Sequence, residues 1–105
     1  MRKVAIVIPV KDEEDGLQYL IKNLEVSGIR KEYEISFLFV IDERTSDDSR
    51  EFAARISEQI IDQRGSHGKG DAIKKAITSL KNSKLDFLKF QNTGHYFFHF
   101  GSIYI

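Results

Sequence analysis

The sequence predicts an α/β fold with three layers, in which helices cover both faces of a mostly parallel β-sheet. Four short apolar segments alternate along the chain with three amphipathic segments, which is the strand-helix order of parallel sheets. The first two apolar segments are almost continuously apolar, as in strands buried on both faces. The 105 residues, 41% of them apolar and 30% charged, suit one small globular domain. We expect the strand order 3-2-1-4.

The first strand and helix are expected at residues 3–10 and 12–28. The sequence KVAIVIPV is short and rich in β-branched residues, which favours a strand. Asp12 is expected to cap the helix and Gly28 to end it. The apolar residues between them recur at helical spacing, namely Leu17, Leu20, Ile21 and Leu24.

A second buried strand is predicted at residues 34–42, from the sequence EISFLFVID. Residues 45–58 then begin with small polar residues that commonly cap helices. Phe52 and Ile56, with the alanines between them, supply an apolar face for that helix.

The remaining elements are a third strand at 59–62, a glycine-rich loop at 64–71, a helix at 71–80 and a fourth strand at 85–90. The last helix is expected to place its apolar residues on one side, namely Ala72, Ile73, Ala76, Ile77 and Leu80.

The C-terminal residues 95–105, HYFFHFGSIYI, differ in composition from the domain at 1–94, because they carry no formal charge and are rich in aromatic residues. We expect an extended tail that pairs with a neighbouring strand. An uncovered apolar strand is an association site, so a homodimer through this tail is also expected.

Composition excludes several classes of function. Lysine plus arginine equals aspartate plus glutamate at 16 each, so no overall field attracts nucleic acid or anionic lipid. No apolar run reaches the ~20 residues of a transmembrane segment, and no signal-peptide cleavage site is visible, so a cytoplasmic protein is expected. The absence of cysteine excludes disulfides and thiolate chemistry.

Polar segments follow all four predicted strands. In an open parallel sheet, ligands bind beyond the carboxyl ends of the strands, where the strand order reverses. Asp42 is the most informative residue, because an aspartate that ends an apolar strand is costly unless it faces a cleft or a partner. The polar segments are residues 9–14, 42–49, 64–71 and 91–94.

The loop at 64–71 has features that suit a phosphate. It opens a helix whose first N–H groups can bind an anion, and Arg64 and Lys69 add positive charge. Gly68 and Gly70 allow the backbone to approach a ligand closely.

Each of these segments also has a purely structural interpretation. The acids at 12–15 suit a helix start, and residues 46–49 suit a helix cap, whether or not a ligand binds. The loop GSHGKG lacks the spacing of a Walker loop. The histidines show no ligand-like grouping in sequence: His67, His95 and His99.

Together, the segments VAIVIPVKDEEDGLQYLIKNL, FVIDERTSDDS and RGSHGKGDAIKKAI resemble the N-terminal half of family 2 glycosyltransferases, with the dolichyl-phosphate mannose synthase-like branch nearest. The resemblance spans residues 3 to about 96. It implies a GT-A, Rossmann-like fold and transfer of a sugar from a nucleotide diphosphate donor of the UDP or GDP type.

The resemblance also implies roles for individual residues. Pro9 and Glu13 would line the nucleotide pocket, and Asp42 would contact the base or the ribose. Lys69 and its loop, with Arg64, Gly68 and Gly70, would lie near the phosphates.

The sequence departs from the family pattern after the fourth strand. The family has an Asp-x-Asp metal motif there, whereas this chain has QNTGHY, with Gln91 and Thr93 in place of the aspartates. These side chains supply oxygens without charge, whereas Mg²⁺ and Mn²⁺ prefer anionic oxygen ligands. We therefore expect no resident cofactor, and only weak Mg²⁺ or Mn²⁺ binding through the donor diphosphate.

Family members are also longer, and their acceptor-binding half lies downstream, so the chain is expected to be truncated. Three functions stay open. The first is a nucleotide-sugar-binding domain without turnover of its own. The second is an atypical active transferase completed by a partner chain, and the third is a non-enzymatic interaction module that keeps only the fold.

Overall fold

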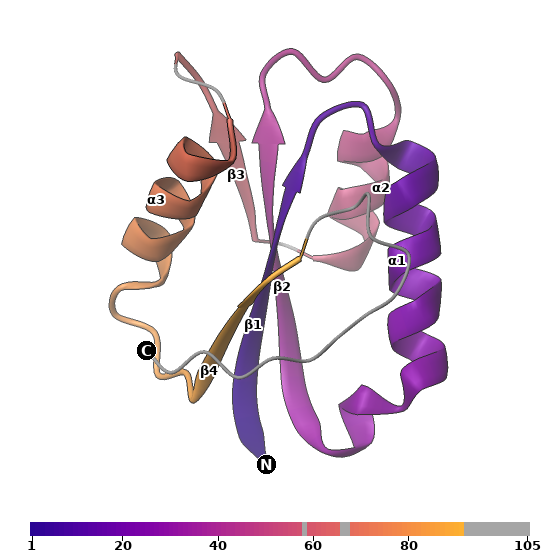
Figure 1. The fold of residues 1–105 in the computed structure, drawn as a ribbon, viewed down its shortest axis with the longest axis vertical. Helices are drawn as coiled ribbons and strands as arrows, with labels where there is room; N and C mark the ends of the chain where they lie inside the picture. The colour runs from indigo at the N-terminus through magenta and orange to yellow at the C-terminus, as the bar shows by residue number, and fades with distance from the viewer. Residues whose placement is uncertain (58, 66–67, 92–105) are drawn as a thin grey trace.

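The computed structural model shows four parallel strands and three α-helices in alternation (Figure 1). It describes residues 1–57, 59–65 and 68–91. Thr93 and the tail 95–105, with its predicted strand and homodimer contact, lie outside the described residues. The elements are β1 (Arg2–Val10), α1 (Glu14–Ser27), the 3-10 helix η1 (Ile29–Lys31), β2 (Tyr33–Asp42), α2 (Ser49–Ile56), β3 (Ile60–Gln63), α3 (Lys69–Leu80) and β4 (Phe87–Phe90).

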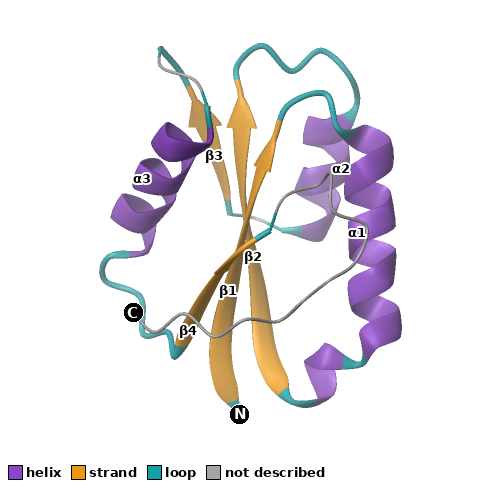
Figure 2. Cartoon of the chain, viewed as in Figure 1, coloured by secondary structure: helices purple, strands orange, loops and turns teal. Residues whose placement is uncertain are grey.

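The sheet has the order β3-β2-β1-β4, with every neighbouring pair parallel, which confirms the predicted fold class and strand order. Helices α1 and α2 cover one face and α3 covers the other (Figure 2). Each face therefore has its own apolar core, and the three layers of the prediction are present.

Strand β1 lies at the centre of both cores. Its residues from Val4 to Ile8 are fully buried. Alternate side chains point to opposite faces of a strand, so Ile6 packs toward α1 while Ala5 and Val7 pack toward α3. This two-sided burial explains why the segment is continuously apolar rather than alternating.

Helix α1 buries the predicted stripe of leucines and ends at Gly28, whose φ of 73° places it in the left-handed region. The prediction that Asp12 caps this helix was wrong. Glu13 occupies the N-cap position and makes no side-chain cap hydrogen bond. Asp12 itself has a φ of 47°, and its carboxylate bonds to another loop.

Helix α3 begins at Lys69, two residues before the predicted start. Ala72, Ala76 and Leu80 lie on its buried face, but the prediction placed Ile77 there too and was wrong, because Ile77 is 51% exposed. Buried residues at i, i+4 and i+8 form a narrow stripe, and the residue after Ala76 is rotated by about 100° away from it. The small alanines let the helix lie close to the sheet.

We predict that Leu24→Ala destabilises the protein by about 2–5 kcal/mol, because Leu24 is only 1% exposed and its truncation leaves a cavity under α1. Val26→Ala, on the same helix and 80% exposed, is the control and should change stability by less than about 0.5 kcal/mol. Urea unfolding measures both values. Equal effects of the two substitutions would contradict the packing of α1.

Candidate functional site

The carboxyl ends of the strands bring the described residues of the predicted polar segments to one edge of the sheet (Figure 1). Asp42 ends β2 and lies in register with Gln63, which ends β3. Gln91 follows β4 and donates its N–H to Val7 O at 2.9 Å. The connection that leaves β1 passes over one face of the sheet through α1, and the connection that reaches β4 passes over the other face through α3. The strand order therefore reverses between β1 and β4, at this edge.

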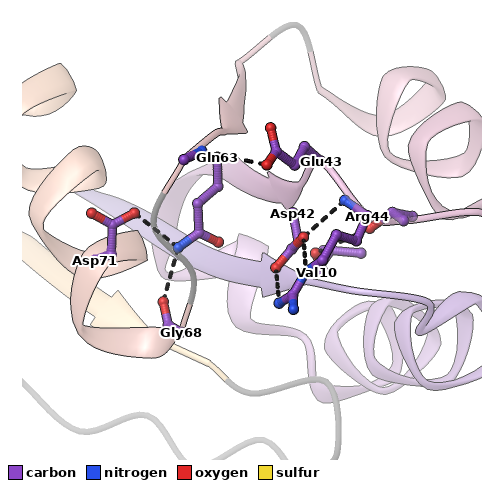
Figure 3. Close-up of polar contacts among 9 residues, drawn as sticks. Val10, Asp42, Glu43, Arg44, Gln63, Gly68 and Asp71 are labelled. Atoms are coloured by element: carbon purple, nitrogen blue, oxygen red, sulfur yellow. Dashed lines mark hydrogen bonds and ion pairs between the residues drawn. The ribbon is translucent and has the colours of Figure 1, made fainter.

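Asp42 is buried at this edge, with 4% of its surface exposed, and Arg44 is one of its partners (Figure 3). Arg44 Nε donates to Asp42 Oδ1 at 2.9 Å, and an η nitrogen donates to Oδ2 at 2.8 Å. The guanidinium thus binds both carboxylate oxygens in a bidentate contact, the fork, and half of the Arg44 side chain stays exposed. The fork explains how an aspartate is tolerated at the end of an apolar strand.

A tight turn places Arg44 beside Asp42. Thr45 N–H donates to Asp42 O at 3.0 Å, which closes a β-turn over residues 42–45. Arg44 N–H also donates to Asp42 Oδ1 at 2.8 Å, the hydrogen bond that defines an Asx-turn. The hydrogen bonds that Asp42 accepts therefore turn the main chain so that Arg44 lies beside the carboxylate of Asp42.

Gln63 forms hydrogen bonds with Gly68 and Asp71 at the start of α3 (Figure 3). It is 3% exposed, and its Nε2 donates to Gly68 O at 2.9 Å and to Asp71 Oδ2 at 3.0 Å. Gly65 and Gly68 adopt φ angles of 84° and 100°, which favour glycine. The buried amide of Gln63 therefore joins the end of β3 to Gly68 and to the first turn of α3.

The loop after β1 is locked to the loop after β2. Asp12 Oδ1 accepts hydrogen bonds from Ser46 N–H at 2.7 Å and from Asp47 N–H at 3.2 Å. In return, Asp47 Oδ2 accepts the N–H of Glu14 at 3.2 Å. Asp47 also accepts bonds from Ser49, whose hydroxyl accepts the N–H of Glu13 at 3.1 Å. The first N–H groups of α1 are thus capped by the loop before α2.

These contacts shift the pKa values of the acids. Hydrogen bonds from Ser46, first that of its N–H, lower the pKa of Asp12. The hydroxyl and then the N–H of Ser49 lower the pKa of Asp47. Shielding from water raises the pKa of Glu14, and the like charges of Asp48 and Asp47 add to that increase. The hydrogen bond to Asp42 raises the pKa of Arg44, which stays charged.

The structure brings part of the predicted nucleotide site to this edge. Pro9 lies near the end of β1, and Glu13 lies at the start of α1. Gly68 immediately precedes α3, whose first two residues are Lys69 and Gly70.

Arg64 lies at the outer side of the same edge. Its side chain is 76% exposed, and its guanidinium lies 3.7 Å from Asp62 Oδ2, with Asp62 also paired to Arg50. Its predicted role beside a phosphate stays a prediction.

Two residues of the site carry no assigned role in the sequence-based prediction, namely Arg44 and Gln63. Each had a weak signal: Arg44 is a cation two residues after the strand-ending acid, and Gln63 is a polar residue directly after the predicted third strand. Spacing alone does not show that either side chain turns inward.

Of the two positions of the predicted metal motif, the structure describes Gln91 and not Thr93. Gln91, at the first position of the predicted metal motif, is a buried neutral amide with 4% exposure. Within residues 1–57, 59–65 and 68–91, no three histidine, aspartate or glutamate side chains are grouped as metal ligands. Mg²⁺ and Mn²⁺ would find amide oxygen here without the anionic charge they prefer.

A separate hollow lies on the outer surface between β3 and α3. It is open, and two of its lining residues also make contacts described above, Asp71 with Gln63 and Asp62 with Arg64. Because it runs along the side of α3 rather than at the strand ends, we do not assign it to the candidate site. Its lining residues are Ile61, Asp62, Asp71, Lys74, Lys75, Thr78 and Ser79.

Solved structures share this fold. Glucosyl-3-phosphoglycerate synthase from Mycobacterium tuberculosis, in complex with Mn²⁺, UDP and glucosyl-3-phosphoglycerate, matches with a TM-score of 0.64 and 15% identity over 88% of this chain and 33% of that one. A mycobacterial protein matches with a TM-score of 0.65 and 18% identity over 88% of this chain and 31% of that one. These likenesses show that the chain shares the α/β fold of the two structures.

The chain spans about a third of the length of these two structures. No protein-family model matches the sequence. No curated protein matches it. The structural likeness supports a GT-A, Rossmann-like fold and gives no particular support to the dolichyl-phosphate mannose synthase-like branch. Every helix in the described parts of the chain is too short or too polar to cross a bilayer.

We predict that part of the acid sensitivity of the protein comes from Asp47. Its folded-state pKa is lowered, so its ionised form stabilises the fold above the unfolded-state value of about 3.9. That contribution is lost as the pH falls through the folded-state pKa. Asp47→Asn keeps an acceptor that does not titrate, so stability should fall less between pH 7 and about pH 3 in this variant.

Urea unfolding at both pH values tests this expectation. Asp48→Asn is the matched control, because it removes the same charge from the adjacent residue, whose side chain makes no cap hydrogen bond to α2. The role of Asp47 is contradicted if both variants lose as much stability in acid as the unmodified protein.

Proposed function

We propose that this chain is a glycosyltransferase-like domain that binds a nucleotide diphosphate sugar of the UDP or GDP type at the carboxyl edge of its sheet. The observation that carries the proposal is the buried carboxylate of Asp42, held at the end of β2 beside the position where the strand order reverses. A solved structure of the same fold, a synthase at 15% identity, contains UDP, which supports a nucleotide as the kind of ligand.

Three strand ends would contribute to the proposed site. Asp42 would accept hydrogen bonds from the base or the ribose, and Pro9 and Glu13 would line the pocket from the loop after β1. The loop that ends at Gly68 would hold the diphosphate with the first N–H groups of α3, whose orientation Gln63 fixes. The residues recognise a nucleotide through contacts that need no metal ion.

Binding without efficient turnover is the form of the function that we favour. A divalent ion normally neutralises the departing diphosphate, and its loss removes a main source of leaving-group stabilisation. The neutral amide of Gln91 does not supply a ligand of that kind. Sugar transfer by an assembly with a partner chain is the alternative, and a test for turnover separates the two.

We predict that Asp42→Ala weakens nucleotide binding more than tenfold. Loss of a charged hydrogen-bond partner costs about 1.5–3 kcal/mol. Calorimetric titration with UDP, GDP and their sugars measures the affinity. Thermal unfolding confirms that the variant is folded, because the substitution also removes the partner of Arg44. Asp42→Asn, which preserves the shape, provides a second variant.

Asp86→Ala is the control for that titration. Asp86 immediately precedes β4 at the opposite edge of the sheet, where it accepts the N–H of Lys3 at 2.8 Å. Its substitution should leave nucleotide affinity unchanged. The assignment of Asp42 fails if its alanine variant binds as well as the unmodified chain, and an absence of nucleotide binding in all variants favours an interaction module instead.

We further predict that a divalent metal ion adds little to binding. The affinity for UDP or GDP should be similar in Mn²⁺ and in EDTA, because uncharged oxygens replace carboxylates at positions 91 and 93. Introducing Gln91→Asp together with Thr93→Asp should create a metal dependence. A strong Mn²⁺ requirement in the unmodified chain would show that another group of residues binds the ion.

A further inference from the structure

Arg44 binds the carboxylate of Asp42, and the proposed function assigns this same carboxylate to nucleotide binding. Both oxygens of Asp42 accept hydrogen bonds from its guanidinium, at 2.9 Å and 2.8 Å. The main-chain N–H of Arg44 takes a further position on Oδ1 at 2.8 Å. A ligand that binds Asp42 through both oxygens must therefore displace the guanidinium.

The contact can be broken without unfolding the turn. The Arg44 side chain is half exposed, so its guanidinium can move into solvent, whereas Asp42 is held at the end of β2. The turn itself is closed by one main-chain hydrogen bond, from Thr45 N–H to Asp42 O, and by one from the main-chain N–H of Arg44 to the side-chain oxygen Oδ1 of Asp42. These bonds do not involve the guanidinium and can persist after it leaves.

The bidentate contact also indicates which chemical groups could replace the guanidinium of Arg44. A guanidinium presents two adjacent N–H donors to two oxygens. A nucleotide presents two adjacent donors in the same manner through the N1–H and N2–H groups of guanine or through the cis-diol of its ribose. The Watson–Crick edge of uracil has one N–H between two carbonyl acceptors, which a two-oxygen carboxylate contact would oppose.

We infer that Arg44 is an internal competitor for the nucleoside, which holds Asp42 in the free protein and releases it to two adjacent donors of the ligand. This inference rests on the proposed function. Because binding requires the released state, the apparent affinity falls in proportion to the fraction of molecules in which Asp42 is released. The released guanidinium keeps its charge and can then pair with a phosphate of the ligand.

The test is calorimetric titration of the unmodified chain and Arg44→Met with guanosine, 2′-deoxyguanosine, uridine and GDP. Methionine removes the donors but keeps a long apolar stem. Without the competitor, at least one nucleoside should bind more than about threefold tighter. GDP should gain less than guanosine, because the variant also lacks the cation that pairs with the diphosphate.

The pattern of gains distinguishes the two sources of paired donors. Gains for guanosine and 2′-deoxyguanosine without a gain for uridine identify the guanine edge. Gains for guanosine and uridine without a gain for 2′-deoxyguanosine identify the ribose diol. Either pattern supports the displacement of Arg44.

Arg50→Met is the matched control, because Arg50 forms a partly exposed ion pair with Asp62 on β3 and its removal should change no affinity. Arg44→Lys keeps the charge without the fork and should also bind nucleosides more tightly, and thermal unfolding shows that each variant is folded. Nucleoside affinity that is unchanged or weaker in both Arg44 variants overturns this inference alone. Absence of binding by every protein, GDP included, overturns the proposed function as well.

Discussion

Burial of strand β1 on both faces is the constraint on which the rest of the structure depends. From Val4 to Ile8 the strand has no exposed surface, because α1 and α2 pack on one side and α3 on the other. Neither face of the central sheet can therefore hold a polar group without a partner. Polar chemistry is confined to the strand ends, and the parallel arrangement brings the carboxyl ends of all four strands to one edge.

At that edge, two buried polar side chains, Asp42 and Gln63, bind groups that follow their own strands in the sequence. Arg44 holds Asp42 within one tight turn, and Gln63 holds Gly68 and Asp71 across the glycine-rich loop. A buried carboxylate with a partly exposed partner is stable in the free protein and still accessible to a competing donor. If Asp42 binds the ligand as proposed, the same contact that makes Asp42 tolerable in the fold sets a cost for ligand binding.

The loops after β1 and β2 behave as one unit, because each caps groups of the other. Asp12 binds the main chain of residues 46 and 47, and Asp47 binds the first N–H of α1. A movement of either loop would break hydrogen bonds in both. The floor of the proposed nucleotide site is therefore more rigid than two separate surface loops would be, which suits recognition of a ligand by preorganised groups.

The sequence by itself determined the three layers, because continuous apolar segments and helical stripes record which surfaces are buried. The predicted strand order 3-2-1-4 is confirmed, and the polar segments after the strands pointed to the edge of the candidate site. It also singled out Asp42, since an acid in an apolar strand requires a partner. Only the tertiary structure decided which partner that is. Arg44 reaches Asp42 through a turn, and Asp47 rather than Asp12 caps α1 across 33 residues of sequence. Such contacts depend on backbone direction and on loops meeting in space, which residue spacing does not encode.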